Sequence, residues 1–274
     1  MPKISILMAS HNGEKFIRQS LDSIINQTFS DFELIVINDA SSDKTAEILK
    51  EYAEKDSRIY LYSNEKNEGL TVSLNIAFKH ISDDSQLICR MDDDDICMPN
   101  RLELQTKYFL LHKETDVVGS NAFVIDDENR IIGERKVPAE NDKIKAALPR
   151  YNPMIHSSVM VKRDVLEKAG GYNEEFRTSQ DYELWFRLAA DGVKFANIPE
   201  NLLKYRETRS AQRRKSMKYR FNDFKIRRQG YKLLKLPFYK YIWLALPLLL
   251  GCIPMPIYNL LRKTDPRRNV KIKA

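Results

Sequence analysis

Four consecutive aspartates, Asp92 to Asp95, carry the strongest chemical signal in the chain. They follow Arg90 and the apolar stretch 86–89, which is typical of a short buried strand. Adjacent carboxylates repel one another, so the run is either a solvated acidic turn or a site where a cation compensates the charge. Carboxylate oxygens are preferred ligands of Mg²⁺ and Mn²⁺, and such ions usually hold substrate phosphates as well. We therefore predict a divalent-metal site that receives a phosphate-bearing ligand.

Polar side chains also follow two other apolar runs. Ser10, His11 and Asn12 come after residues 4–9, and Asp39 comes after residues 32–37. Ligands of open parallel sheets bind just outside the carboxyl ends of the strands. We expect these groups and the acidic run to gather at one such edge as a nucleotide and metal side. No GxGxxG or GxxxxGKS/T motif occurs, which disfavours a dinucleotide-binding domain and a P-loop NTPase.

Asp181 stands at the start of a predicted helix, within Ser179-Gln180-Asp181. Two interpretations remain open. An aspartate at this position complements the helix dipole and caps the helix. A carboxylate at a helix N-terminus can also accept the proton of a sugar hydroxyl.

Strand and helix patterns alternate four times in the first hundred residues. Apolar runs at 4–9, 32–37, 59–62 and 86–89 predict strands buried on both faces, with amphipathic helices between them. This alternation implies right-handed βαβ units and a parallel sheet. A helix at 101–111 is followed by a mixed half, with strands predicted at 117–125, 157–161, 195–198 and 202–206. We predict an α/β fold with a mostly parallel central sheet flanked by helices.

Composition indicates a globular protein with one large domain and an appendage. The 274 residues are 43% hydrophobic and 30% charged. The three cysteines form no CxxC pair, which disfavours a disulfide framework or a zinc site and favours a reducing cytosol. The first residues read as a strand rather than as a secretory leader.

The net charge of +7 is unevenly distributed along the chain. From Lys204 onward there are 20 Lys and Arg against 3 Asp and Glu, whereas residues 1–203 hold 25 basic and 35 acidic side chains. We predict a catalytic domain at 1–206 and a basic, helical tail at 207–274. An acidic body with a basic tail suggests that the tail meets an anionic surface.

The tail contains an uncharged stretch, residues 241–261, which is long enough to span a bilayer. Pro247, Pro254 and Pro256 interrupt it, so we favour a segment that lies on the inner leaflet of the cell membrane with polybasic support. A true span and a helical hairpin folded against the body are the alternatives. Nucleic-acid binding is disfavoured, because no nucleic-acid motif accompanies the basic charge.

Several spaced motifs together resemble the family 2 inverting glycosyltransferases of the GT-A fold. The resemblance covers roughly residues 3–206, and its motifs are Ile4 to Asn12, Ile35 to Thr45, Asn67-Glu68-Gly69 with Asn75, Arg90 to Ile96, Pro153 with His156, and Gln180 to Trp185. These enzymes transfer a sugar from a nucleotide-diphosphate sugar to an acceptor hydroxyl.

The resemblance implies a role for each matching residue. Asp39 would bind the nucleobase, usually uracil in this family, above Ser10, His11 and Asn12. Asp92 and Asp94 match the ends of the D-x-D motif of the Mg²⁺ or Mn²⁺ site, with Asp94 as the direct ligand and Asp92 near the ribose or the metal. Asp181 matches the general base. Arg90 would support the diphosphate, and His156 would lie near the pyrophosphate or acceptor unless it is a packed core histidine.

Three residues depart from the family pattern. His11 stands where the family usually has Tyr, Gln180 replaces the common Glu before the base, and Thr208 replaces the His of a Y-R-x-H motif. Loss of that His predicts looser binding of the donor.

The resulting expectation is a metal-dependent inverting glycosyltransferase. Its donor would be a nucleotide-diphosphate sugar, and its acceptor a saccharide, lipid-linked in surface polysaccharide assembly. We expect it in the cytoplasm, peripherally attached to the inner face of the membrane. The alternatives are a non-catalytic scaffold that binds sugar nucleotides and a nucleotidyltransferase, and the latter lacks the glycine-rich phosphate loop expected after the first strand.

Overall fold

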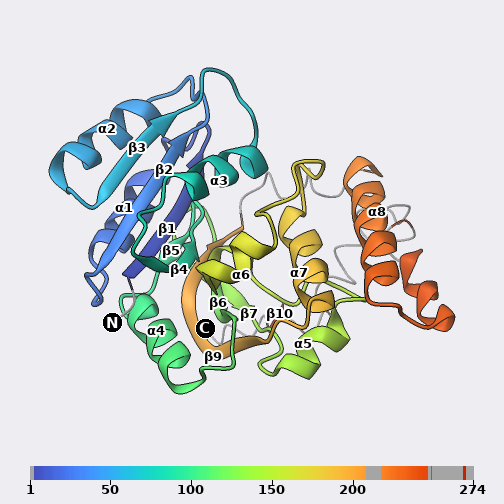
Figure 1. Ribbon diagram of the computed structural model, residues 1–274. Helices are drawn as coiled ribbons and strands as arrows, with labels where there is room; N and C mark the ends of the chain where they lie inside the picture. Colours follow the sequence, from blue (N-terminus) through green and yellow to red (C-terminus); the bar gives the residue numbers. More distant parts are fainter. Residues whose placement is uncertain (1–2, 208–216, 246–247, 249–267, 270–274) are drawn as a thin grey trace.

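Helices cover a single twisted sheet (Figure 1). The computed structural model describes residues 3–207, 217–245, 248 and 268–269. In chain order the elements are β1 (Lys3–Ser10), α1 (Ile17–Ile25), β2 (Phe32–Asn38), α2 (Thr45–Lys55), β3 (Ile59–Ser63), α3 (Leu70–Lys79), β4 (Ser85–Arg90), β5 (Ile96–Cys97), α4 (Arg101–Leu111), β6 (Val117–Ile125), β7 (Ile131–Arg135), α5 (Asn141–Ala147), η1 (His156–Ser158), β8 (Met160–Lys162), α6 (Arg163–Lys168), α7 (Gln180–Ala190), β9 (Phe195–Arg206), α8 (Met217–Leu233), η3 (Phe238–Leu244) and β10 (Arg268–Asn269).

The strand order is β10-β7-β6-β8-β4-β1-β2-β3, with β9 paired to β6 and to β5. β1 pairs in parallel with β2 and β4, and β2 pairs in parallel with β3. In the second half β8 is antiparallel to β4 and β6, whereas β9 is parallel to β6. The predicted α/β fold, with a parallel first half and a mixed second half, is confirmed.

The packing of β2 explains why the sequence of a buried strand in this protein is a continuous apolar run. Ile35 and Ile37 belong to a core formed with α3, α6 and α7, whereas Leu34 and Val36 belong to a second core formed with α1, α2 and α4. Successive side chains of a strand point to opposite faces, so a strand covered on both faces is apolar at every position.

Two strand predictions in the mixed half were wrong in detail. Residues 156–158 form the 3₁₀ helix η1, and the strand predicted at 157–161 begins only at Met160. The two strands predicted at 195–198 and 202–206 are one strand, β9, whose pairing with β6 shifts in register around Asn121.

Neither α2 nor α7 begins with a side-chain cap, so the interpretation of Asp181 as a cap is corrected. Lys44 and Ser179 occupy the N-cap positions of α2 and α7, and among the described residues neither helix has a side-chain hydrogen bond from its N-cap. Asp43 instead accepts a hydrogen bond from the N–H of Thr45 at 3.0 Å. Asp181 lies inside the first turn of α7 rather than at its cap.

The described part of the predicted tail begins with α8, which packs on the body of the protein. Ile226, Tyr231 and Leu244 are buried in the same core as α7. No helix within the described ranges has both the length and the apolar character needed to cross a membrane. Most of the uncharged stretch 241–261 lies outside the described residues, and the division at 206/207 stays a prediction.

Candidate functional site

The ends of β1 and β2 bring the predicted nucleotide-side residues together. Ser10 and Asn38 are paired in register, and the N–H of Asp39 donates to the carbonyl of Ser10 at 2.8 Å. Nδ1 of His11 lies 2.7 Å from the carbonyl oxygen of Asp39. The imidazole of His11 is exposed, so it is available to stack on a planar ligand.

Asn12 connects the loop after β1 to the loop after β2. Its backbone lies in the left-handed region (φ 57°), and its N–H donates to Oγ of Ser41 at 3.1 Å. Its side-chain Oδ1 accepts from the N–H of Ser42 at 2.8 Å. Asn12 therefore fixes the spacing of the two loops beside His11.

The carboxylate of Asp39 is held by donors of the segment after β3. Oδ1 accepts from Nδ2 of Asn64 at 2.7 Å and from the N–H of Glu68 at 2.9 Å, and Oδ2 accepts from the N–H of Gly69 at 2.8 Å. Asp39 is only 3% exposed. Since each carboxylate oxygen accepts up to about two hydrogen bonds, Oδ2 can take a second one from a ligand N–H group.

The acidic loop, residues 92–95, follows β4 at the same edge. Ligand atoms of Asp92, Asp94 and Asp95 lie within 4.8 Å of one another. The two predicted metal ligands are thus together, and Asp95, for which no separate function was predicted, joins them. Arg90 is 3% exposed and forms an ion pair with Asp92. Its predicted contact with a diphosphate stays a prediction.

Asp93 and Asp95 are anchored inside the protein. Oγ of Ser10 donates to Asp93, and a Cβ on Gly13 would lie 2.4 Å from Oδ2 of that carboxylate, so only glycine fits there. Asp95 accepts from Oγ of Ser157 at 2.5 Å and from the N–H of Arg206 at 2.7 Å. Asp93 and Asp95 therefore orient the acidic loop.

Crowding makes the acidic loop hard to ionise fully. Burial, together with the charge of Asp92, raises the pKa of Asp95 to about 7 and that of Asp93 to about 6. A cation held by the loop would relieve this repulsion. The loop therefore has the electrostatics expected of a metal site.

Arg206, at the end of β9, is a supporting residue to which the sequence analysis assigned no function. Its guanidinium donates to the carbonyls of Asp94 and Asp126, at 2.7 and 2.6 Å, and to Oδ1 of Asn129 at 2.6 Å. It also lies over the ring of Phe16, 4.1 Å from the centroid. The motif Tyr205-Arg206-Glu207-Thr208 contains Arg206 and could have indicated it. Only Thr208 was interpreted, and that residue lies outside the described residues.

Asp181 lies in the other half of the molecule, in the first turn of α7. It is partly exposed, and its Oδ2 accepts a hydrogen bond from Nδ2 of Asn152 at 2.6 Å. Asn152 was not predicted, since an asparagine in a loop gives no signal in the sequence. The hydrogen bond fixes the orientation of the Asp181 carboxylate, which remains partly accessible.

His156 is affected by charges from both halves of the molecule, those of Asp92 in the acidic loop and Asp181 in α7. Its Nε2 lies 2.8 Å from the hydroxyl of Tyr172. Burial lowers the pKa of His156 to about 4, while the charges of Asp181 and Asp92 act in the opposite direction. His156 is therefore neutral near pH 7, and carboxylates from both predicted sites lie within electrostatic range of it.

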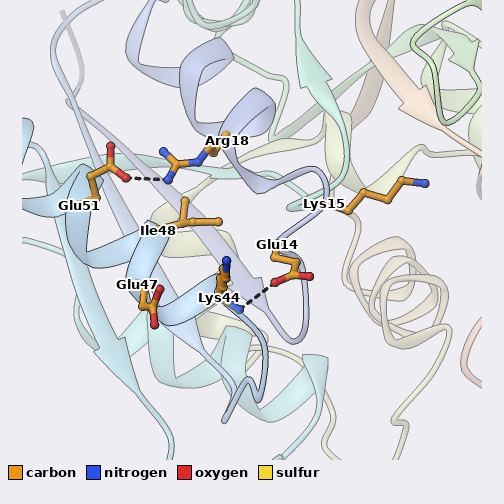
Figure 2. A pocket seen from close by; sticks show the side chains of 7 residues that line it. All are labelled: Glu14, Lys15, Arg18, Lys44, Glu47, Ile48 and Glu51. Carbon is orange, nitrogen blue, oxygen red and sulfur yellow. Dashed lines mark hydrogen bonds and ion pairs between the residues drawn. The ribbon is translucent and has the colours of Figure 1, made fainter.

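A charged pocket of about 580 Å³ opens beside the loops after β1 and β2 (Figure 2). Arg18 pairs with Glu51 at 2.7 Å, and the N–H of Lys44 donates to Glu14 at 3.0 Å, while Lys15 points away from these groups. No predicted site residue lines this pocket, so we assign it no function.

Comparisons with known proteins agree with this geometry. The family model described as "Glycosyl transferase family 2" matches residues 5–170. EpsE of Bacillus subtilis (strain 168) is 34% identical over 94% of this chain and 92% of its own length. The O-antigen biosynthesis glycosyltransferase WbnJ of Escherichia coli is 37% identical over 79% of this chain and 84% of its own.

A solved structure shares the architecture. The crystal structure of S. aureus TarS 1-349 in complex with UDP-GlcNAc superposes with a TM-score of 0.69 and 18% identity, over 90% of this chain and 71% of that chain. At this identity the likeness concerns the fold alone, which is the GT-A fold. On the match of its sequence, the chain belongs to glycosyl transferase family 2.

Proposed function

We propose that the protein is a metal-dependent inverting glycosyltransferase that uses a nucleotide-diphosphate sugar, most simply a UDP-sugar. The observation that carries the proposal is the acidic loop at the carboxyl edge of the sheet, beside Asp39 and within electrostatic range of the same histidine as Asp181. Candidate residues for metal binding, nucleotide binding and general-base catalysis are therefore found around one region of the molecule.

The donor would bind along the ends of β1, β2 and β4. Oδ2 of Asp39 can accept an N–H of a pyrimidine base, and the exposed ring of His11 can stack on it. Ser10 and Asn12 act by fixing the loops on which these groups stand.

The acidic loop fits a hard divalent cation, Mg²⁺ or Mn²⁺. Asp94 and Asp92 would hold it, whereas both oxygens of Asp95 already accept hydrogen bonds within the protein. When bound, such an ion neutralises the charge that develops on a diphosphate leaving group. The ion pair with Arg90 orients Asp92 when no cation is bound.

Asp181 would accept the proton of the acceptor hydroxyl as that oxygen attacks the anomeric carbon. The hydrogen bond from Asn152 orients the carboxylate, and general-base assistance of this kind typically contributes about 10²–10⁴-fold. Since one base and no enzyme nucleophile are involved, a single displacement would invert the anomeric centre. Neutral His156 would line this region as an uncharged hydrogen-bonding group.

The acceptor we propose is a saccharide of surface polysaccharide assembly, presented on a lipid at the inner face of the cell membrane. The name of WbnJ, an O-antigen biosynthesis glycosyltransferase, supports the polysaccharide context. Exposed aromatic and aliphatic side chains at η3, together with nearby lysines, support peripheral attachment to anionic lipid.

The test is a calorimetric titration with UDP in Mn²⁺ and in EDTA, repeated on Asp94→Ala, followed by a transfer assay that reads the anomeric configuration of the product. We expect metal-dependent binding that the variant loses, and an inverted product. A product with the configuration of the donor would refute the single displacement. Binding without transfer to any saccharide would favour the alternative, a sugar-nucleotide-binding scaffold.

A further inference from the structure

The residue before α7 adopts a backbone conformation that needs external support. Ser179 has a φ of 56°, in the left-handed region, and directly precedes Gln180 and Asp181. A non-glycine residue in this region costs on the order of 1 kcal/mol and persists when neighbouring contacts fix it. The conformation of Ser179 sets the direction in which the first turn of α7, and with it Asp181, begins.

Two consecutive residues of α8 supply that support. Nδ2 of Asn222 donates to the carbonyl and to Oγ1 of Thr178, at 2.7 and 3.0 Å. Oγ of Ser179 donates to Oδ1 of Asp223 at 2.9 Å. The two residues that lead into α7 are therefore each held by a side chain that lies 44 positions later in the chain.

The same helix also holds the segment on the other side of Asp181. The hydroxyl of Tyr231 and Nη1 of Arg227 both donate to the carbonyl of Pro149, at 2.5 and 3.1 Å. Pro149 lies three residues before Asn152, whose amide donates to Asp181. Both the backbone of Asp181 and its hydrogen-bond partner are thus supported from α8.

Tight packing makes α8 a rigid support. A Cβ on Gly230 would lie 2.3 Å from ring atoms of Phe186, so the ring of this α7 residue packs directly on the backbone of α8. Ile226 and Tyr231 are buried in the core that contains α7. Figure 1 shows α8 beside α7, at the end of the molecule away from α2.

We propose that α8 belongs to the catalytic support of the enzyme, with Asn222 and Asp223 as positioning residues for Asp181. The inference rests on the proposed function, in which Asp181 is the general base. On this proposal, the basic C-terminal region orients the general base, in addition to any contact that it makes with a membrane.

The test compares four single variants and one double variant of the full chain. Asp223→Ala and Ser179→Ala each remove the same hydrogen bond, Asp223→Asn keeps an oxygen that accepts it, and Gln229→Ala changes an exposed residue of the same helix. We expect the two alanine variants at 179 and 223 to lower kcat tenfold or more, with the Kd for UDP and the KM for the donor within twofold of the parent. Asp223→Asn and Gln229→Ala should stay within twofold in every parameter, and the double variant Ser179→Ala/Asp223→Ala should resemble the singles.

Unchanged kcat in folded Asp223→Ala would overturn the inference, and so would a parallel loss of UDP affinity, since a merely structural residue would affect both. A second readout does not depend on activity. The N–H of Glu183 donates to the carbonyl of Ser179 in the first turn of α7, so we expect its hydrogen exchange to accelerate in Asp223→Ala but not in Gln229→Ala. If the parent protein transfers no sugar, the proposed function fails, whereas unchanged exchange at Glu183 would refute the positioning by α8.

Discussion

The acidic loop and the N-terminus of α7 present carboxylates in contrasting surroundings. In the acidic loop, negative charges crowd together and are anchored by donors from β1, η1 and β9. Asp181 instead receives its hydrogen bond from the neutral side chain of Asn152. The first arrangement suits the attraction of a cation, and the second leaves an oriented, partly accessible carboxylate, as the proposed general base requires.

The difference also concerns where the support comes from. The acidic loop follows β4 directly. The neighbouring strands, parallel β1 and antiparallel β8, bring its partners Ser10 and Ser157 to the same edge. The backbone before Asp181 is instead held by α8, a helix that comes after β1 to β9 in the chain. Nucleotide binding and proton transfer should therefore respond to different substitutions.

The substitution Asp181→Asn gives the largest expected effect. The amide keeps the shape of the side chain but cannot take the proton, so kcat should fall by about 10²–10⁴-fold while the Kd for UDP stays within twofold. Initial-rate kinetics and calorimetry measure the two quantities. Asp191→Asn, an exposed carboxylate at the other end of α7, is the matched control and should behave like the parent. Equal losses of rate and UDP affinity would show that the two regions do not act separately.

The substitution Arg206→Met tests the anchoring of the acidic loop. It leaves the buried carbonyls of Asp94 and Asp126 without their donor, so the free energy of unfolding should fall by about 3 kcal/mol and the Kd for Mn²⁺ should rise about tenfold. Urea denaturation and a Mn²⁺ titration measure these changes. Arg130→Met removes an exposed arginine that pairs with Asp126 and should leave the free energy of unfolding nearly unchanged, because solvent screens such pairs. Similar losses in both variants would refute a special function of Arg206.

The sequence predicted what depends on local order and missed what depends on distant contacts. Strand ends at Asn12, Asp39 and Asp94 were identified because a buried strand leaves a continuous apolar run before each of them. The bond from Arg206 to the carbonyl of Asp94 joins residues 112 positions apart, and no periodicity reports such a contact. Asp95 looks like its neighbours in the sequence, and only its burial distinguishes it as an anchor rather than a ligand. The support of Asp181 by α8 was not predicted, because the basic charge of that region indicated a contact with an anionic surface instead.

The pH dependence of stability should carry the signature of the acidic loop. A carboxyl whose pKa is raised to about 7 on folding binds more protons in the native state than in the unfolded state between about pH 4 and pH 7. Its contribution to the free energy of unfolding is therefore fully present below about pH 4 and is lost as the pH rises through 7, by on the order of a few kcal/mol. Urea unfolding of metal-free parent and Asp95→Asn at pH 5 and pH 8 measures the difference. We expect the parent to lose more stability than the variant between these values, and saturating Mn²⁺ at pH 8 to restore the parent.

An equal change in parent and Asp95→Asn would mean that Asp95 is ionised throughout this range, and that the repulsion in the acidic loop is already compensated within the protein. The carboxyls of Asp43 and Asp56, whose pKa values hydrogen bonds lower on folding, contribute stability that is already fully present above about pH 4. Because they are common to both proteins, the comparison with the variant removes their contribution.

The smallest expected effect on catalysis belongs to the surface that follows α8. Phe238 and Ile242 are 87% and 74% exposed, and Lys235 and Lys240 lie near them in the chain. Apolar side chains beside basic ones favour binding to anionic lipid, so Phe238→Ser/Ile242→Ser should weaken binding to phosphatidylserine vesicles by about tenfold. The rate with a soluble acceptor should not change, since neither side chain contacts the acidic loop or Asp181 in the described structure.

Leu110→Ser/Leu111→Ser, an exposed apolar pair at the end of α4, is the control, and vesicle sedimentation is the measurement. Equal weakening in both double variants would indicate unspecific adsorption. Selective weakening would place the membrane on the side of α8 and Asp181, so that a lipid-linked acceptor would approach the base directly while the metal and nucleotide remain at the sheet edge.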